Sequence, residues 1–250
     1  MTKALDVLRQ FQTLRAEGQA GNGFLEILPP LDQDELLRLE KQIPCPIPEE
    51  ARDLFSYARG FKVQSLLLRR PCRLSSIDLS GPDAEFGLEH VFPHAVSIAD
   101  DGCGNFWVID LTKDSKSWGP VFFACHDPAV IVYETESVAG FMDDVLGEAH
   151  GNTSSKLETI CDEAAGRIWR DNPNVMPFEQ CAASTDEELR AFARSLDASY
   201  EFIDLRRPNL GDGYSWGRYG PSTVNRRFGE KRIFACQKKK KWQRFKEFWK

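Results

Sequence analysis

Three residue types that could build a thiol hydrolase follow one another at Cys125-His126-Asp127. A nucleophilic cysteine needs a histidine within hydrogen-bond reach, and in such enzymes the two usually come from distant segments of the chain. Neighbouring residues of a strand point to opposite faces of the sheet, so a strand would keep Cys125 and His126 apart. We therefore predict a buried strand cysteine followed by a turn, and we assign no catalytic residue.

Two histidines, His90 and His94, have the spacing that places zinc ligands on one face of a helix. Pro93 lies between them and disfavours a helix, and Val91 occupies the place of the glutamate in an HExxH site. No cysteine or acidic cluster nearby offers third and fourth ligands at the usual spacing. We predict no metal site here.

The acidic, glycine-containing segment from Asp100 to Asn105 has some of the residue types of a calcium loop. It lacks the alternating ligands of such a loop, and Leu111 is apolar at the twelfth position, where a bidentate glutamate is needed. Glycines that accept positive φ, next to Asp and Asn, are typical of a β-hairpin turn. The sequence therefore predicts a hairpin turn and no bound cation.

Glycines alternate with aromatic residues and an arginine between Gly211 and Gly220, which includes Tyr214, Trp216 and Arg218. The segment is no phosphate-binding loop, because it lacks the GxxxxGK[ST] pattern. Tyr, Trp and Arg are enriched at the centres of protein interfaces, so one interpretation is a partner-binding loop. The other is a tightly turned loop whose aromatic side chains cover the C-terminal sheet.

The elements that must position these residues follow from apolar periodicity and turn residues. The N-terminal half favours helices at residues 2–17, 32–43, 48–58 and 137–146 and strands at 63–68, 95–99, 105–111, 121–125 and 129–135. Asp32 and Glu35 have the spacing of a capping box at the start of the second helix. The pattern predicts an α+β fold in which two or three helices surround consecutive, mostly antiparallel hairpins.

The C-terminal part begins after a small, polar stretch at residues 147–155, which we interpret as a linker. The apolar pattern of this part favours helices at 156–170 and 185–196 and strands at 200–205 and 232–236. It ends in a basic tail whose aromatic residues would share one face of a helix. We expect an N-terminal helix and lead-in at 1–24, a core domain at 25–147, and an α+β extension or small second domain at 151–250.

Several short motifs in the core domain occur in a fixed order. They are Leu36-x2-Leu39-Glu40-x2-Ile43, Ile47-Pro48-x2-Ala51-x2-Leu54-Phe55, Gly60-Phe61, the glycine-turn hairpin at 98–110, the strand and turn at 121–127, and the helix motif at 137–146. In this order they resemble the SUKH superfamily over roughly residues 31–146. One departure is Arg59, where the family often has asparagine.

The resemblance implies a small sheet wrapped by helices, no cofactor, and a protein-binding role. The superfamily includes bacterial toxin-immunity proteins, which typically neutralise a cognate toxin by binding it, and fungal cell-wall regulators. The similarity does not extend to residues 1–24 or 151–250, so it gives no expectation for them.

Charge is distributed unevenly along the chain. Residues 238–250 contain seven basic residues and one acid, a net charge of +6. Since the whole chain has a net charge of −6, residues 1–237 carry a net charge of −12. An acidic body repels phosphate and argues against nucleic acid as the partner, whereas it would speed association with a cationic protein. No apolar run is long enough to span a membrane.

The seven cysteines are scattered, and the N-terminus shows no secretory signal pattern. Reduced, buried thiols and a cytoplasmic location are therefore expected.

Together with the resemblance, these features predict a non-enzymatic immunity-type protein that binds a cognate toxin, which we expect to be cationic. The alternatives are a regulatory scaffold of the same fold, acting in the cell envelope or in signalling, and an enzyme in the C-terminal region.

The candidate contact residues are acids expected to be exposed on hairpin turns and near the closing helix, together with polar and aromatic residues of the glycine-rich loop. They are Asp100, Asp101, Asp114, Glu134, Glu136, Tyr214, Trp216 and Arg218.

Overall fold

The computed structural model describes residues 25–63, 76–79, 88–149 and 156–238, together with residues 5–7, 9, 10 and 13. The residues of this short N-terminal group are helical, and the rest of the helix expected at 2–17 lies outside the described residues. Most of the predicted linker and the basic tail at 241–250 also lie outside them.

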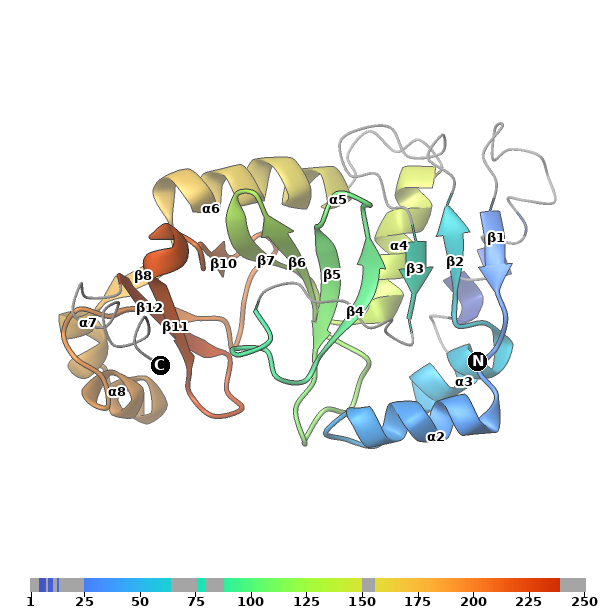
Figure 1. Ribbon diagram of the computed structural model, residues 1–250, viewed down its shortest axis with the longest axis horizontal. Coiled ribbons are helices and arrows are strands. Elements are labelled where there is room, and N and C mark those ends of the chain that lie inside the picture. The colour runs from blue at the N-terminus through green and yellow to red at the C-terminus, as the bar shows by residue number, and fades with distance from the viewer. Residues whose placement is uncertain are drawn as a thin grey trace, which may run out of the picture.

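Within the described residues, eight strands form one antiparallel sheet in the order β1-β2-β3-β4-β5-β6-β7-β10 (Figure 1). They are β1 (Leu25–Leu28), β2 (Gly60–Val63), β3 (Ser76–Asp78), β4 (Ala95–Asp100), β5 (Phe106–Asp110), β6 (Val121–His126), β7 (Ala129–Thr135) and β10 (Gly213–Tyr214). The last of these comes from the glycine-rich loop and pairs with β7.

Helices cover one face of this first sheet and bury the larger core. They are α2 (Gln33–Gln42), α3 (Glu49–Tyr57), α4 (Val138–Ala149), α5 (Lys156–Glu158), the π-helical turn η1 (Thr159–Ala164) and α6 (Ala165–Asp171). The predicted capping box is present, since Asp32 accepts from the Glu35 N–H and Glu35 accepts from the Asp32 N–H. Arg59, the departure from the family pattern, lies 3.5 Å from Glu35 and 3.3 Å from Asp78 and so links α2 to β3.

The second sheet consists of β8 (Val175–Pro177), β9 (Glu201–Asp204), β11 (Thr223–Arg227) and β12 (Ile233–Lys238). Its described strands are antiparallel and lie in the order β11-β12-β9-β8. Helices α7 (Phe178–Ala182) and α8 (Glu187–Arg194) cover one face, where Phe192 meets Phe202 edge-on at 5.6 Å between ring centroids.

The two sheets share a third core, which joins the two parts of the molecule. Phe92 stacks on Phe234 of β12 at 5.0 Å, and Tyr214 of β10 stacks on the same ring at 5.3 Å. Strand β6 is buried on both faces, because Phe123 packs under the helices while Phe122 packs toward the second sheet. A strand covered on both faces needs a continuous apolar run, and Val-Phe-Phe-Ala-Cys supplies it.

The α+β class predicted from the sequence is confirmed, with the antiparallel sheet and the separate four-stranded sheet as its two β layers. Strand β7 has the predicted bounds, and β4, β5, β6, β9 and β12 lie close to theirs. Of the strand expected at 63–68, only Val63 lies within the described residues, where it belongs to β2, a strand that begins earlier, at Gly60. No helix in the described part of the chain is both long and apolar enough to cross a membrane.

The cysteines only partly match the expectation of reduced, buried thiols. Cys45, Cys125, Cys181 and Cys236 are free and buried, as expected. Cys103 is free but exposed on the β4–β5 turn, and Cys161 on η1 is disulfide-bonded, so the expectation was wrong for these two.

Candidate functional site

Cys125 and His126 end strand β6, and their surroundings differ as expected for neighbours on a strand. The Cys125 side chain is buried, and burial raises the pKa of its thiol to about 11. His126 is exposed and places Nδ1 2.9 Å from Oδ1 of Asn105. Because the thiol stays protonated at neutral pH and the His126 ring contacts Asn105 instead, the two side chains do not form the ionised thiol–imidazole pair that nucleophilic catalysis needs.

The segment from Asp100 to Asn105 forms the β4–β5 hairpin turn. Asp101 accepts from the backbone N–H groups of Cys103 and Asn105 at 2.8 and 3.1 Å. Gly102 and Gly104 adopt φ values of 70° and 90°. The carboxylate of Asp101 therefore stabilises the turn. In the part of the chain that the structure describes, no cluster of three His, Cys, Asp or Glu side chains could hold a metal ion.

The acids predicted as partner contacts lie at two opposite ends of the first sheet. Asp100 and Asp101 lie at the end that also carries the β6–β7 turn, while Asp114 lies at the other end, in the loop between β5 and β6. Glu136 follows β7 at this second end, and it accepts the hydroxyl of Tyr133 at 2.8 Å.

Glu134 is not the exposed acid that the sequence suggested. It lies in β7 with only 2% of its surface exposed, and Trp107 Nε1 donates to its Oε2 at 2.7 Å. Burial and the negative charge of Asp144 raise the pKa of Glu134 to about 8. The expectation of an exposed acid was wrong because Glu134 lies in the buried part of β7, where the neutral carboxyl group accepts the indole N–H.

Tyr214 is also buried, so it cannot be an exposed contact residue in this structure. Its ring packs against Phe234, which corresponds to the predicted alternative of aromatic residues covering the C-terminal sheet. Trp216 is partly exposed, and Arg218 is exposed with Nη1 donating to the backbone oxygen of Trp169 at 3.3 Å. Trp169 itself is 40% exposed on α6, and this exposure was not predicted from the sequence.

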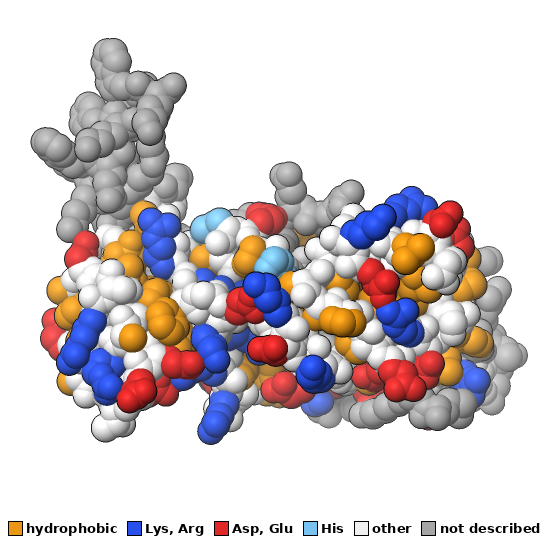
Figure 2. All heavy atoms as spheres, turned by 90° about the horizontal axis from the view of Figure 1, so that it is seen from below, with side chains coloured by type: hydrophobic (Ala, Val, Ile, Leu, Met, Phe, Trp, Pro, Cys, Tyr) orange, Lys and Arg blue, Asp and Glu red, His pale blue; other side chains and the backbone are white. Residues whose placement is uncertain are grey.

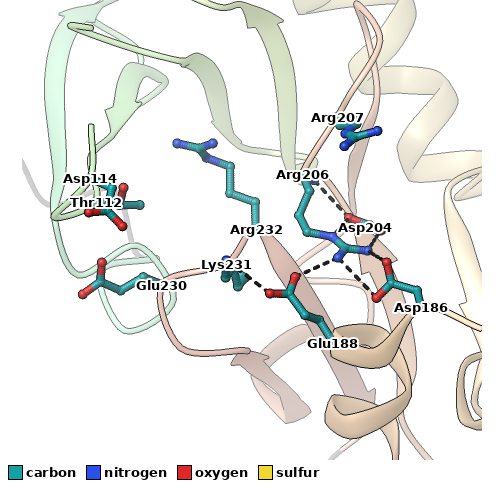
Figure 3. A pocket seen from close by; sticks show the side chains of 10 residues that line it. All are labelled: Thr112, Asp114, Asp186, Glu188, Asp204, Arg206, Arg207, Glu230, Lys231 and Arg232. Atoms are coloured by element: carbon teal, nitrogen blue, oxygen red, sulfur yellow. Dashed lines mark hydrogen bonds and ion pairs between the residues drawn. The ribbon is translucent and has the colours of Figure 1, made fainter. Parts of the chain in front are cut away.

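A charged cleft of about 740 Å³ opens where the two parts of the molecule meet (Figure 3). The first part contributes the loop after β5, and the C-terminal region contributes the start of α8, the end of β9 and the β11–β12 turn. The lining residues are Thr112, Asp114, Asp186, Glu188, Asp204, Arg206, Arg207, Glu230, Lys231 and Arg232. The lower face of the molecule shows acidic and basic side chains close together (Figure 2).

Arg206 organises the C-terminal wall of the cleft. Its guanidinium lies 2.6 Å from Asp204, 2.8 Å from Asp186 and 2.8 Å from Glu188. Hydrogen bonds from Arg206 lower the pKa of Asp186, and those from Lys231 and Arg206 lower the pKa of Glu188. These carboxylates therefore remain ionised and fixed in place.

Asp110 clamps the two parts together behind this wall. It is fully buried at the end of β5, and Arg227 of β11 donates to its two oxygens at 2.8 and 2.9 Å. Arg232 adds a bond to the Asp110 carboxylate at 2.7 Å and one to its backbone oxygen at 2.9 Å. A buried carboxylate needs such partners, since an unpaired buried charge costs several kcal/mol, on the order of 3–5.

In the comparison with protein families, residues 30–144 match the SMI1 / KNR4 family (SUKH-1). The chain contains a SUKH-1 domain. Its matched range nearly coincides with the resemblance found at residues 31–146, which is thereby confirmed. Comparisons with curated proteins and with solved structures yield no significant match.

The cleft was not predicted from the sequence. Eight of its ten lining residues lie outside the SUKH-1 match, and its ion pairs join positions as distant as Asp110 and Arg232. The sequence does contain several arginines around β9, β11 and β12. Their spacing, however, does not indicate which carboxylates they pair with.

Proposed function

We propose that this protein is a non-enzymatic immunity-type protein that binds and neutralises a cognate toxin protein in the cytoplasm. The observation that carries the proposal is the SUKH-1 domain, because the family is typical of immunity proteins against polymorphic toxins. The surroundings of Cys125 support it, since the residues that most resembled a catalytic set provide neither an ionised thiol nor a base directed at it.

The acidic body supports a cationic toxin. Residues 1–237 carry a net charge of −12, and long-range attraction would raise the rate at which a positively charged partner arrives. The proposed contact residues are those predicted from the sequence that the structure leaves accessible. They are Asp100, Asp101, Asp114, Glu136, Trp216 and Arg218.

Co-expression tests the proposal. Each protein encoded next to the gene for this chain is produced from an inducible promoter, with and without the chain, and growth is recorded. We expect one of these proteins to arrest growth, the chain to restore it, and the two proteins to co-purify as a stable complex.

The proposal fails if none of these proteins is toxic, or if the chain neither protects from the toxic one nor binds it. A growth or envelope defect on deletion of the gene, with no toxin present, would favour the regulatory scaffold.

A further inference from the structure

Most charges that line the cleft are already paired within the molecule. Arg206 is held by three carboxylates, and Lys231 lies 3.2 Å from Glu188. Glu230 lies 3.3 Å from Lys113, and Arg232 is bound to Asp110. A ligand that used any of these groups would have to compete with an existing ion pair.

Two lining charges have no such partner. Among the described residues, Asp114 and Arg207 make no ion pair and no hydrogen bond, and both side chains are exposed. Asp114 lies on the wall formed by the loop after β5, and Arg207 lies on the opposite wall, beyond the end of β9 (Figure 3). The SUKH-1 domain thus offers an unpaired carboxylate, Asp114, and the C-terminal region offers an unpaired guanidinium group, Arg207, across the same cleft.

The paired groups between these two walls are fixed in position. The Arg206 side chain is 24% exposed and the Arg232 side chain 21%, so both guanidiniums are largely covered while they bind their carboxylates. A partner can therefore pair with Asp114 and Arg207 without breaking the ion pairs between them, so the ordering cost of binding falls mainly on these two exposed side chains and on the partner. A volume of about 740 Å³ is within the range of established ligand sites and accommodates a few side chains.

We propose that this cleft is a docking site for a segment of a partner protein that carries one basic and one acidic side chain. The basic side chain pairs with Asp114 and the acidic one with Arg207. The inference rests on the proposed function, because it assigns part of the partner-binding surface to the junction of the SUKH-1 domain with the C-terminal region. Neither part forms the site alone.

Selection of phage-displayed random dodecapeptides on the immobilised full chain tests this proposal without a known toxin. The wild-type chain should enrich peptides that share one basic and one acidic residue at a constant separation. Asp114→Lys makes both walls basic, so the peptides enriched on this variant should carry two acids. Arg207→Glu makes both walls acidic and should enrich peptides with two bases.

Affinities of the selected peptides, measured by fluorescence anisotropy, complete the test. A peptide selected on the wild-type chain should bind each variant about five- to tenfold more weakly, because reversing one exposed charge replaces an attraction of at most about 1 kcal/mol with a repulsion. The loss should shrink at high salt. Exposed charges outside the cleft, changed in Glu179→Lys on α7 and Arg194→Glu on α8, serve as matched controls and should leave selection and affinity unchanged.

Peptides without a shared charge pattern, or peptides that bind all five proteins equally, would overturn the inference. That outcome leaves protection from a toxin in the co-expression assay unaffected. Conversely, a chain that selects the expected peptides but protects from no toxin would contradict the proposed function and leave the docking site in place.

Discussion

The carboxyl group of Glu134 lies in the interior of the SUKH-1 domain, where one oxygen accepts the Trp107 indole N–H and the other has no hydrogen-bond partner among the described residues. Asp144 on α4 and Lys156 on α5 act on it with opposite charges, but burial has the largest effect on its pKa. The acid therefore stays protonated in the folded protein to about pH 8, whereas it ionises near pH 4.5 once the chain unfolds.

This difference predicts a pH-dependent stability. Between pH 4.5 and about 8 the folded state holds a proton that the unfolded state releases, so the free energy of unfolding should fall as pH rises, by up to about 1.4 kcal/mol per pH unit. Glu134→Gln removes the titrating group and should flatten this part of the curve in urea unfolding measured across that range. Glu179→Gln, at an exposed site on α7, should retain the wild-type slope, and equal slopes for all three proteins would contradict the account.

At the level of elements, strands with regular apolar patterns were predicted well from the sequence. Segments whose structure depends on pairing with distant elements were not. Strands β6 and β7 and the capping box of α2 follow from residues close in the sequence. Strand β10 could not be predicted, because two residues inside a glycine-rich loop become a strand only when the edge of β7 is there to pair with them. Glu134 was wrongly expected to be exposed, and the sequence left the burial of Tyr214 open, because burial at both positions depends on elements distant in the chain.

Gly213 shows how closely β10 must approach β7. A Cβ atom at this position would lie 1.9 Å from the backbone oxygen of Ile131, and backbone cannot move aside as a flexible side chain can. Gly213→Ala should therefore lower the free energy of unfolding by about 1–3 kcal/mol, as measured by chemical denaturation.

Gly166→Ala on α6 is the matched control for this substitution. Its new Cβ meets only the mobile end of Arg170, and alanine is the better helix former. It should be neutral or stabilising, so a loss of similar size in both variants would show that close packing of β10 is not the cause.

At the level of the whole molecule, the two sheets are joined by a shared aromatic core and by the Asp110 clamp. Arg227 lies 5.5 Å from the ring centroids of both Phe92 and Phe234, so the clamp and the core meet at one side chain. The SUKH-1 domain could be predicted because its motifs are ordered along the chain. The cleft could not, because its residues come together only when a region without recognisable motifs docks on that domain.

The buried Asp110 clamp should contribute far more to stability than the partly exposed ion pairs around Arg206. Asp110→Asn leaves two arginines with an uncharged, fully enclosed partner and should lower the free energy of unfolding by about 3–5 kcal/mol. Asp204→Asn removes one of three partly exposed partners of Arg206 and should cost at most about 1 kcal/mol. Denaturant titration of both variants measures the difference, and equal losses would argue against a buried clamp.

Neutralisation of a toxin by binding can be tested by titrating toxin activity against increasing amounts of the purified chain. Binding predicts that inhibition is complete near one chain per toxin, does not increase with incubation time, and is reversed when the complex is dissociated. Time-dependent inactivation by a small fraction of one equivalent would instead reveal an enzyme, and full toxin activity at a large excess of the chain would contradict the claim altogether.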